Sequence, residues 1–277
     1  MVFFMKKSLK KQQIRQLMEN FKQKLGYECN LKDPKTIQEK IQWIKIYGKL
    51  ERFARFTDKY EVRKFIRKKI GKEYLIPHLG VYDHVDKIDF DRLPHSFVLK
   101  ATHGSSWFMI VEDKEQIDWQ ETKRIMDSWL QSSWFSKSKE SNYKPLKKRI
   151  IIQQYLPRMF KQFAEYSFHC FHGVPQFVRV DGFRSFGIYS MNWDPIMETF
   201  DPHHGGGPIE KPDTFDRMVV IAKTLSKDLP YVRVDLFDAG GRIYFNELTF
   251  TPGGGYLQTS SDFGLWVGSL LDLKKYV

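Results

Sequence analysis

Cysteine is scarce in this chain: of its 277 residues, only Cys29 and Cys170 are cysteines. Two widely separated cysteines make neither a disulfide framework nor a paired zinc knuckle. No apolar run approaches the roughly 18 residues of a membrane-spanning helix. The apolar segment 1–5 is too short for a secretory signal and stands on the wrong side of its lysines. We therefore expect a soluble, globular, intracellular protein.

Two sequence features of other fold classes are also missing. The chain has no internal repeat and no low-complexity tract. It has no Gly-x-Gly-x-x-Gly motif within an alternating βαβ series, which argues against a Rossmann oxidoreductase. It has no zinc knuckle, KH loop or RNP motif, so nucleic acid is not an expected partner.

Positive charge and aromatic side chains are plentiful. The chain carries 45 Lys and Arg against 33 Asp and Glu, a formal net charge of +12, and 16% of its residues are aromatic. Its 42% hydrophobic content argues against a disordered chain and allows a buried core. The charge favours anionic partners such as nucleotides, acidic glycans or a lipid surface.

The densest basic run, residues 6–11, opens a segment whose apolar residues recur at helical spacing over 8–25. The simplest interpretation is a helix that packs through its apolar face and exposes a basic face to solvent. Peripheral contact with an anionic membrane surface or a lipid-linked polymer, at the inner face of the membrane, stays open as an alternative.

Helical and strand patterns follow one another in a mixed order. Periodicity and capping residues predict helices over 36–47, 58–70, 115–132 and 213–227. Runs of β-branched and aromatic residues predict strands over 96–100, 108–111, 149–152, 166–171, 176–180, 231–237 and 242–248. Polar residues 136–149 indicate a loop. The order favours an α+β fold.

Lys100 ends one predicted strand and is followed by the small-residue loop Ala101-Thr-His-Gly-Ser-Ser106. A lysine in this position can reach a phosphate as a point charge, and the backbone N–H groups of such a loop can close over a triphosphate. Taken alone, the pattern fits a plain hairpin with a surface lysine better.

Two carboxylates fall on predicted neighbouring strands. Arg233-Val-Asp235 precedes Glu247-Leu-Thr249, and the antiparallel pairing of the two segments would bring Asp235 beside Glu247. Hard oxygen ligands in this arrangement suit Mg²⁺, which binds through one or two carboxylates plus substrate phosphates. Arg233, two residues from Asp235, would share its face and can stabilise a transferring phosphoryl group. A cross-strand ion pair on a solvated face is the alternative.

Two further segments contribute weaker signals. Thr251-Pro-Gly-Gly-Gly255 follows the last predicted strand, and its backbone amides can hold an oxyanion or a substrate carboxylate, unless it is only a flexible connector. Asp58-Lys59 stands at a predicted helix start, where Asp58 can act as a cap and Lys59 as a surface charge.

Together these motifs resemble the ATP-grasp superfamily, and specifically its TupA-like branch of polysaccharide biosynthesis. The segment from Arg233-Val-Asp235 to Glu247-Leu-Thr249-Phe-Thr-Pro252-Gly253 is similar to the metal site of D-alanine–D-alanine ligases, where Arg-x-Asp precedes Glu-x-Asn and a Pro-Gly turn. The TupA-like resemblance also takes in Glu39-Lys-Ile-Gln-Trp43, Lys59-Tyr-Glu-Val-Arg63 and Tyr244-Phe-Asn-Glu-Leu-Thr-Phe250. It therefore covers nearly the whole chain.

The resemblance implies an ATP-grasp fold, in which two α+β lobes clasp ATP. The expected lobes are residues 58–156 and 157–277, after a helical N-terminal segment 1–57 that replaces the Rossmann-like domain of typical ligases. The implied cofactors are ATP and Mg²⁺. The residues implied to bind the nucleotide are Lys59, Lys100, Thr102, Gly104, Ser105, Ser106, Gln153, Gln154, Tyr155, Leu156 and Glu165.

The remaining site residues divide into metal, catalytic and substrate roles. The resemblance implies that Asp235, Glu247 and Thr249 hold the metal, and that Arg233, Lys100 and Gly254 take part in catalysis, with Gly253 and Gly255 beside the substrate. Arg179 and Arg184 can grip an anionic substrate, although surface salt bridges explain them equally well.

Three positions depart from the pattern of the superfamily. Thr249 stands where the third metal ligand is usually Asn, so coordination there would use a hydroxyl or a water molecule. Gln153 stands where the hinge residue is usually Glu, yet it can still accept a hydrogen bond from the adenine amino group. The missing Rossmann-like domain leaves the substrate less certain than the nucleotide chemistry.

The activity implied by the resemblance is ADP-forming carboxylate–amine ligation through an acyl phosphate. The implied partners are a uronic acid-containing acidic glycan of a bacterial capsule or cell surface, and an amine such as an amino acid or peptide. One alternative is a phosphotransferase of the same fold that acts on a glycan or a lipid-linked sugar. Another is a non-catalytic basic binding protein, although the filled positions Lys100, Arg233, Asp235 and Glu247 argue against it.

Overall fold

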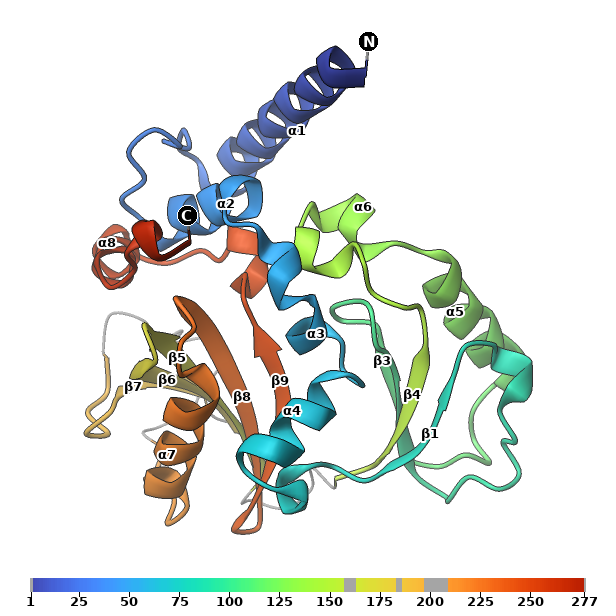
Figure 1. Cartoon of the computed structure of the whole chain (residues 1–277). Coiled ribbons are helices and arrows are strands. Elements are labelled where there is room, and N and C mark those ends of the chain that lie inside the picture. The colour runs from blue at the N-terminus through green and yellow to red at the C-terminus, as the bar shows by residue number, and fades with distance from the viewer. Residues whose placement is uncertain (1, 157–162, 183–185, 197–208, 277) are drawn as a thin grey trace.

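The computed structural model describes residues 2–156, 163–182, 186–196 and 209–276 (Figure 1). The chain opens with the elements α1 (Val2–Leu25), α2 (Ile37–Tyr47), η1 (Leu50–Phe53), α3 (Ala54–Thr57), α4 (Val62–Lys69) and η2 (Lys72–Tyr74). Helix α2 begins where the sequence predicts because Thr36 and Glu39 form a capping box, in which each side chain accepts a hydrogen bond from the other residue's backbone N–H. None of the helices in the described residues is long and apolar enough to cross a membrane.

A four-stranded antiparallel sheet forms next, in the order β1-β4-β2-β3. Its strands are β1 (His78–Tyr82), β2 (Phe97–Ala101), β3 (Phe108–Val111) and β4 (Ile150–Gln154), and η3 (Val85–Lys87) follows β1. Strands β2 and β3 form the predicted hairpin, with Lys100 opposite Phe108. Helix α5 (Trp119–Gln131) packs on this sheet through the buried side chains of Met126 and Trp129.

A five-stranded antiparallel sheet makes up the second half, in the order β7-β6-β5-β8-β9. Its strands are β5 (Phe163–Phe171), β6 (Val174–Gly182), β7 (Phe186–Ser190), β8 (Tyr231–Ala239) and β9 (Arg242–Thr249). Helix α7 (Phe215–Ser226) covers one face and buries Phe215, Met218 and Leu225 against it. The chain then passes through η7 (Pro252–Gly255), α8 (Ser261–Ser269) and η8 (Leu273–Tyr276).

The two sheets lie side by side, and α1, α2 and α8 gather at one end of the molecule (Figure 1). The larger core joins the five-stranded sheet to α2, α3, α4, α7 and α8, whereas a separate core lies between the four-stranded sheet and α5. The mixed α+β arrangement is confirmed. The lobe boundaries after residues 57 and 156 remain proposals.

Some elements differ from the sequence-based expectation. Strands β1 and β7 are not predicted from the sequence. Strand β1 is a short segment that contains Gly80 and is stabilised by pairing with the distant strand β4. The short helix α6 (Trp134–Ser138) and η4 (Ser141–Tyr143) reach into the segment 136–149 that the sequence assigned to a loop. Helix α4 begins at Val62, because Asp58 accepts hydrogen bonds from the backbone N–H groups of Tyr60 and Glu61 in the turn before it.

Candidate active site between the two sheets

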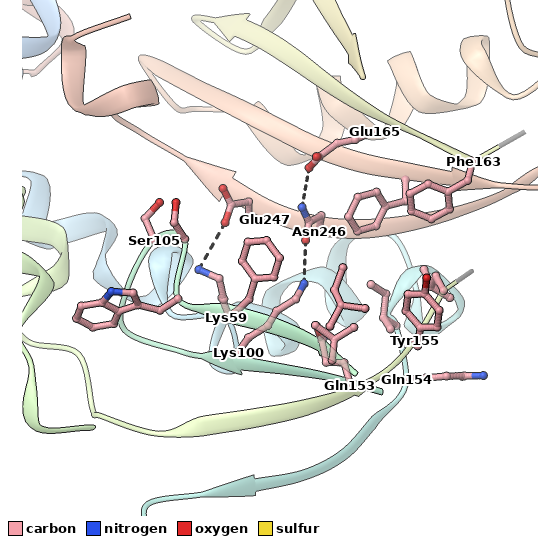
Figure 2. A pocket seen from close by; sticks show the side chains of 18 of the residues that line it. Lys59, Lys100, Ser105, Gln153, Gln154, Tyr155, Phe163, Glu165, Asn246 and Glu247 are labelled. Carbon is pink, nitrogen blue, oxygen red and sulfur yellow. Dashed lines mark hydrogen bonds and ion pairs between the residues drawn. The ribbon is translucent and has the colours of Figure 1, made fainter. Parts of the chain in front are cut away.

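A cavity of about 290 Å³ lies between the two sheets (Figure 2). The four-stranded sheet supplies one wall through β2, β3 and β4, and the five-stranded sheet supplies the other through β5, β8 and β9. One part of its lining is apolar and comprises Ile76, Val98, Ile110, Leu156, Phe163 and Phe237. Lys59, Lys100, Arg233, Asn246 and Glu247 line it with polar groups. A nucleotide needs this combination, because its base is largely apolar and its phosphates are charged.

Two lysines from distant segments enter the charged part of the cavity. Lys59 Nζ donates to the carbonyl oxygen of Gly104 at 2.8 Å and lies 3.5 Å from Glu247 Oε2. Lys100 Nζ donates to Asn246 Oδ1 at 3.3 Å, so β2 and β9 are linked across the cavity. Both lysines point from the first half of the chain toward the second (Figure 2).

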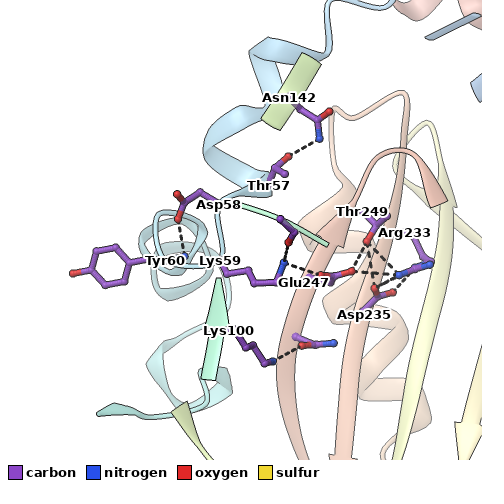
Figure 3. Close-up of polar contacts among 12 residues, drawn as sticks. Thr57, Asp58, Lys59, Tyr60, Lys100, Asn142, Arg233, Asp235, Glu247 and Thr249 are labelled. Carbon is purple, nitrogen blue, oxygen red and sulfur yellow. Dashed lines mark hydrogen bonds and ion pairs between the residues drawn. The ribbon is translucent and has the colours of Figure 1, made fainter. Parts of the chain in front are cut away.

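The carboxylates of Asp235 and Glu247 lie side by side, as the sequence predicts, because their Cα atoms are register partners on β8 and β9. Arg233 shares the face of Asp235 and binds it with Nε 2.8 Å from Oδ1 and Nη2 2.6 Å from Oδ2. The Thr249 hydroxyl donates to Glu247 Oε1 at 2.8 Å. Figure 3 shows that Arg233, Asp235, Glu247 and Thr249 form one polar cluster at the end of Lys59.

The charges within this polar cluster, together with burial, shift the pKa values of Glu247 and Asp235. Burial disfavours the ionised form of Glu247, but the charges of Lys59 and Arg233 outweigh it and lower its pKa to about 2. Burial raises the pKa of Asp235, although Arg233 opposes this effect. Glu247 is therefore ionised at neutral pH and is the anionic group that faces the cavity.

The oxygen donors of this cluster fit a magnesium ion. No group of three or more His, Cys, Asp or Glu side chains in the described part of the chain is arranged to hold a metal. Mg²⁺ requires fewer, because it binds through one or two carboxylates and completes its shell with phosphates and water. Glu247 and Thr249 present oxygens to such an ion, whereas both oxygens of Asp235 are held by Arg233.

Asn246 is a site residue that sequence reasoning missed. It donates through Nδ2 to Glu165 Oε1 at 2.7 Å and accepts from Lys100. The pairing register shifts between Asp235 and Leu236, and this β-bulge lets the consecutive residues Asn246 and Glu247 both line the cavity. A regular strand would point them to opposite faces, and no residue type in the sequence signals the bulge.

Glu165 lies on β5 at the base of the cavity. Burial raises its pKa to about 7, and the nearby charges of Asp235 and Glu247 act in the same direction. Its carboxylate accepts the Asn246 amide hydrogen bond, which partly opposes that rise. Glu165 lines the cavity, and the ribose-binding role that the resemblance implies for it stays a prediction.

Most of the predicted nucleotide-binding residues meet in this cavity. Besides Lys59, Lys100 and Glu165, the members are Ser105, Ser106, Gln153, Gln154, Tyr155 and Leu156. Gly104 contributes the carbonyl oxygen that holds Lys59. Thr102 is buried behind the lining, and its hydroxyl donates to the carbonyl oxygen of Lys147. It supports the loop rather than facing the cavity.

The predicted substrate residues fall in two adjoining cavities. Arg179 lines one of about 310 Å³ that also reaches Arg233 and Gly255, and it pairs with Asp181 at 2.9 Å. Gly253 and Gly254 line the other, of about 710 Å³, which shares Arg233 and Glu247 with the nucleotide cavity. Arg184 lies outside the described residues.

Comparison with known families settles the classification. A family model described as TupA-like ATPgrasp matches residues 39–272. The chain belongs to the TupA-like ATP-grasp family. Its fold is therefore the ATP-grasp fold, and ATP is the nucleotide that the name of the family gives. The resemblance to TupA-like ATP-grasp proteins is confirmed over most of the chain.

Solved structures of similar shape are distant in sequence. D-alanine–D-alanine ligase from Helicobacter pylori is 14% identical, with 78% of this chain and 61% of that chain covered and a TM-score of 0.43. Biotin carboxylase from Campylobacter jejuni is 12% identical, with 87% and 53% covered and a TM-score of 0.48. The ATP-grasp ligase PsnB, in complex with a minimal precursor, Mg and ADP, is 13% identical, with 83% and 62% covered and a TM-score of 0.43. No curated protein matches in sequence.

The chain covers only part of the length of these solved structures. This TupA-like chain spans 61% of the length of the H. pylori ligase.

Proposed function

We propose that this TupA-like protein is an ADP-forming carboxylate–amine ligase. In this proposal it joins an amino acid or short peptide to uronic acid carboxylates of a bacterial capsular or cell-surface polysaccharide, in the cytoplasm where ATP is available. The observation that carries it is the convergence of Lys59, Lys100, Arg233 and Glu247 at the charged part of the cavity between the two sheets. Three cations beside one ionised carboxylate form a site for a metal-bound triphosphate.

Each group of residues has a defined task in this reaction. The apolar lining, with Gln153 at its edge, would hold the adenine, and Glu165 would bind the ribose. Lys59 and Lys100 would bind the phosphates, and the Ser105–Ser106 segment would close over them. Glu247, with Thr249 and Asp235 beside it, would hold Mg²⁺, which neutralises charge on the phosphates when bound.

The chemistry requires two transfers. A carboxylate oxygen of the acceptor attacks the γ-phosphorus of ATP, and the bond to the ADP oxygen breaks. The amine nitrogen then attacks the resulting acyl carbon, so that phosphate leaves, an amide forms and the nitrogen loses a proton. Arg233 lines both the nucleotide cavity and the adjoining cavity of about 710 Å³, and it would stabilise the transferring phosphoryl group. Gly253, Gly254 and Gly255 would lie beside the tetrahedral oxyanion.

Trapping with hydroxylamine tests this proposal. Purified protein would be incubated with MgATP, hydroxylamine in place of the amine, and a panel of uronic acid oligosaccharides. Joint appearance of ADP and a hydroxamate is the expected result, and it would also identify the carboxylate. ADP without hydroxamate would instead indicate a phosphotransferase of the same fold. A protein that fails to bind MgATP would contradict the enzyme assignment.

A further inference from the structure

The cavity of about 710 Å³ beside the nucleotide site has no role in the reaction as described so far. Its walls come from α1, from Lys45 on α2, from the α6–η4 segment 134–143 and from the chain after β9. We call it the α1–α6 cavity. It shares Ser105, Ser106, Arg233 and Glu247 with the nucleotide cavity, so the two meet where a γ-phosphate would lie.

We propose that the α1–α6 cavity binds the carboxylate-bearing sugar acceptor and directs its carboxylate toward Arg233. This inference rests on the proposed ligase function and adds to it the location and chemistry of the acceptor site. Helix α1 then becomes a wall of that site.

The first argument is charge. Lys24, Lys45, Lys137 and Lys139 all line this cavity in addition to Arg233. The carboxylate of Glu140, which also lines it, accepts hydrogen bonds from Trp134 Nε1 at 3.0 Å and from the Thr251 hydroxyl. Glu140 and Glu247 are the two carboxylates of the lining, against five Lys and Arg side chains, so the net charge of the lining is positive and an anionic ligand is favoured there.

The second argument is the environment of Lys45. Its side chain is buried, donates to the carbonyl oxygen of Gly254 at 3.1 Å and lies 4.9 Å from the centre of the Tyr256 ring. Burial lowers the pKa of Lys45 to about 8, although the nearby charge of Glu140 opposes this effect, and among the described residues no carboxylate oxygen lies within 4.0 Å of its ammonium group. A buried ammonium without a carboxylate partner is costly, and a ligand carboxylate would supply the missing partner.

The third argument separates a sugar acid from an amino acid as the occupant. The cavity is lined by the aromatic side chains of Trp134 and Tyr143, and aromatic rings can pack against the C–H faces of sugars. Its volume lies in the range of sites for ligands much larger than an amino acid. Size and aromatic lining together favour an oligosaccharide that carries carboxylates.

The fourth argument is that α1 is fixed against this site. Lys24 Nζ lies 4.4 Å from the centre of the Tyr256 ring, and the carbonyl oxygen of Lys24 accepts a hydrogen bond from Gln258 at 3.2 Å. Phe21, one turn earlier on the helix, is fully buried. The C-terminal half of α1 is consequently packed on the chain that follows β9, rather than detached from the body.

Calorimetric titration with tri-galacturonic acid as the probe tests the assignment. The variant Lys137→Glu reverses an exposed charge in the cavity wall, and Lys45→Gln removes the buried one. Lys227→Glu is the matched control, because it makes the same charge change at an exposed position that lines none of the cavities described here. MgATP would be titrated into every variant, and a neutral trisaccharide would control for binding without carboxylates.

We expect Lys137→Glu and Lys45→Gln to weaken tri-galacturonate binding at least tenfold, while Lys227→Glu and all MgATP affinities stay within twofold of wild type. Equal binding of the probe by wild type and Lys137→Glu would overturn the proposal, as would the absence of probe binding to protein that binds MgATP. L-glutamate would be titrated into the same variants, and a loss of affinity confined to L-glutamate would overturn the sugar assignment. Failure of MgATP binding alone would count against the ligase function and not against this cavity.

Discussion

The ammonium group of Lys59 donates a hydrogen bond to the carbonyl oxygen of Gly104 at 2.8 Å, and the backbone N–H of Lys59 donates one to the carbonyl oxygen of Thr102 at 3.2 Å. One residue thus holds the loop after β2 in two places. The same ammonium lies 3.5 Å from Glu247, on the opposite sheet (Figure 3). A triphosphate bound in the cavity would offer this cation stronger acceptors than a carbonyl oxygen.

Replacement of Lys59 by Met should weaken MgATP binding by about 10- to 100-fold, since a hydrogen bond to a charged group contributes about 1.5–3 kcal/mol. Calorimetric titration of MgATP measures the change. The control is Lys68→Met, which removes an exposed lysine on helix α4, the helix that follows Lys59. Equal affinities in the two variants would show that Lys59 does not contact the phosphates.

Replacement of Glu247 by Gln should lower ATP turnover about 100-fold or more, because the neutral amide is a poor ligand for Mg²⁺ at the position where the phosphates need it. The measurement is ADP release as a function of Mg²⁺ concentration. Glu115→Gln, at an exposed site, is the control. Retained turnover in the Glu247→Gln protein would refute the metal assignment.

The central cluster could be predicted from the sequence because its geometry is local. Arg233 and Asp235 are two residues apart on one strand and so share a face, and Glu247 follows after a tight turn that fixes the register of β8 and β9. Hairpins such as β2–β3 are predictable for the same reason, since a short loop determines which residues become partners.

Features that depend on distant segments escaped prediction. Strand β1 is stabilised by pairing with β4, some seventy residues later, and its own sequence contains Gly80. Asn246 enters the site through a bulge that leaves no mark in the sequence. The α1–α6 cavity arises from the packing of four separate segments. Hydrophobic residues that recur with a period of two or 3.6 indicate which face of a strand or helix is buried. They do not indicate which strands and helices pack against one another.

Replacement of Gly255 by Ala should destabilise the fold by about 2–4 kcal/mol. Its φ of +78° is unfavourable for an alanine, and a Cβ there would lie 2.6 Å from Gln42 Nε2 and 2.8 Å from Ile41 Cγ2. Gly241→Ala is the matched control, because its φ is +86° but nothing lies within 4 Å of an added Cβ. Urea denaturation should show a cost of only about 1 kcal/mol for the control. Equal losses of stability in the two variants would mean that helix α2 shifts to make room for the added methyl group at position 255.

The stability of the metal-free protein should depend on pH through Glu165. Its folded-state pKa of about 7 lies above the value of an unfolded glutamate, about 4.5, so the folded state binds more protons than the unfolded state between these values. The contribution of Glu165 to the free energy of unfolding therefore falls as pH rises from about 4.5 to 7. Above pH 7 the folded protein carries the full cost of a buried charge.

Glu165→Gln isolates this effect from the other titrating groups. The amide keeps the shape of the side chain but cannot ionise, so the variant should gain stability relative to wild type at pH 8 compared with pH 5. Urea denaturation of both proteins at the two pH values, without Mg²⁺ or nucleotide, measures the difference. A stability difference that is the same at pH 5 and pH 8 would show that neither burial nor the charges of Asp235 and Glu247 raise the pKa of Glu165.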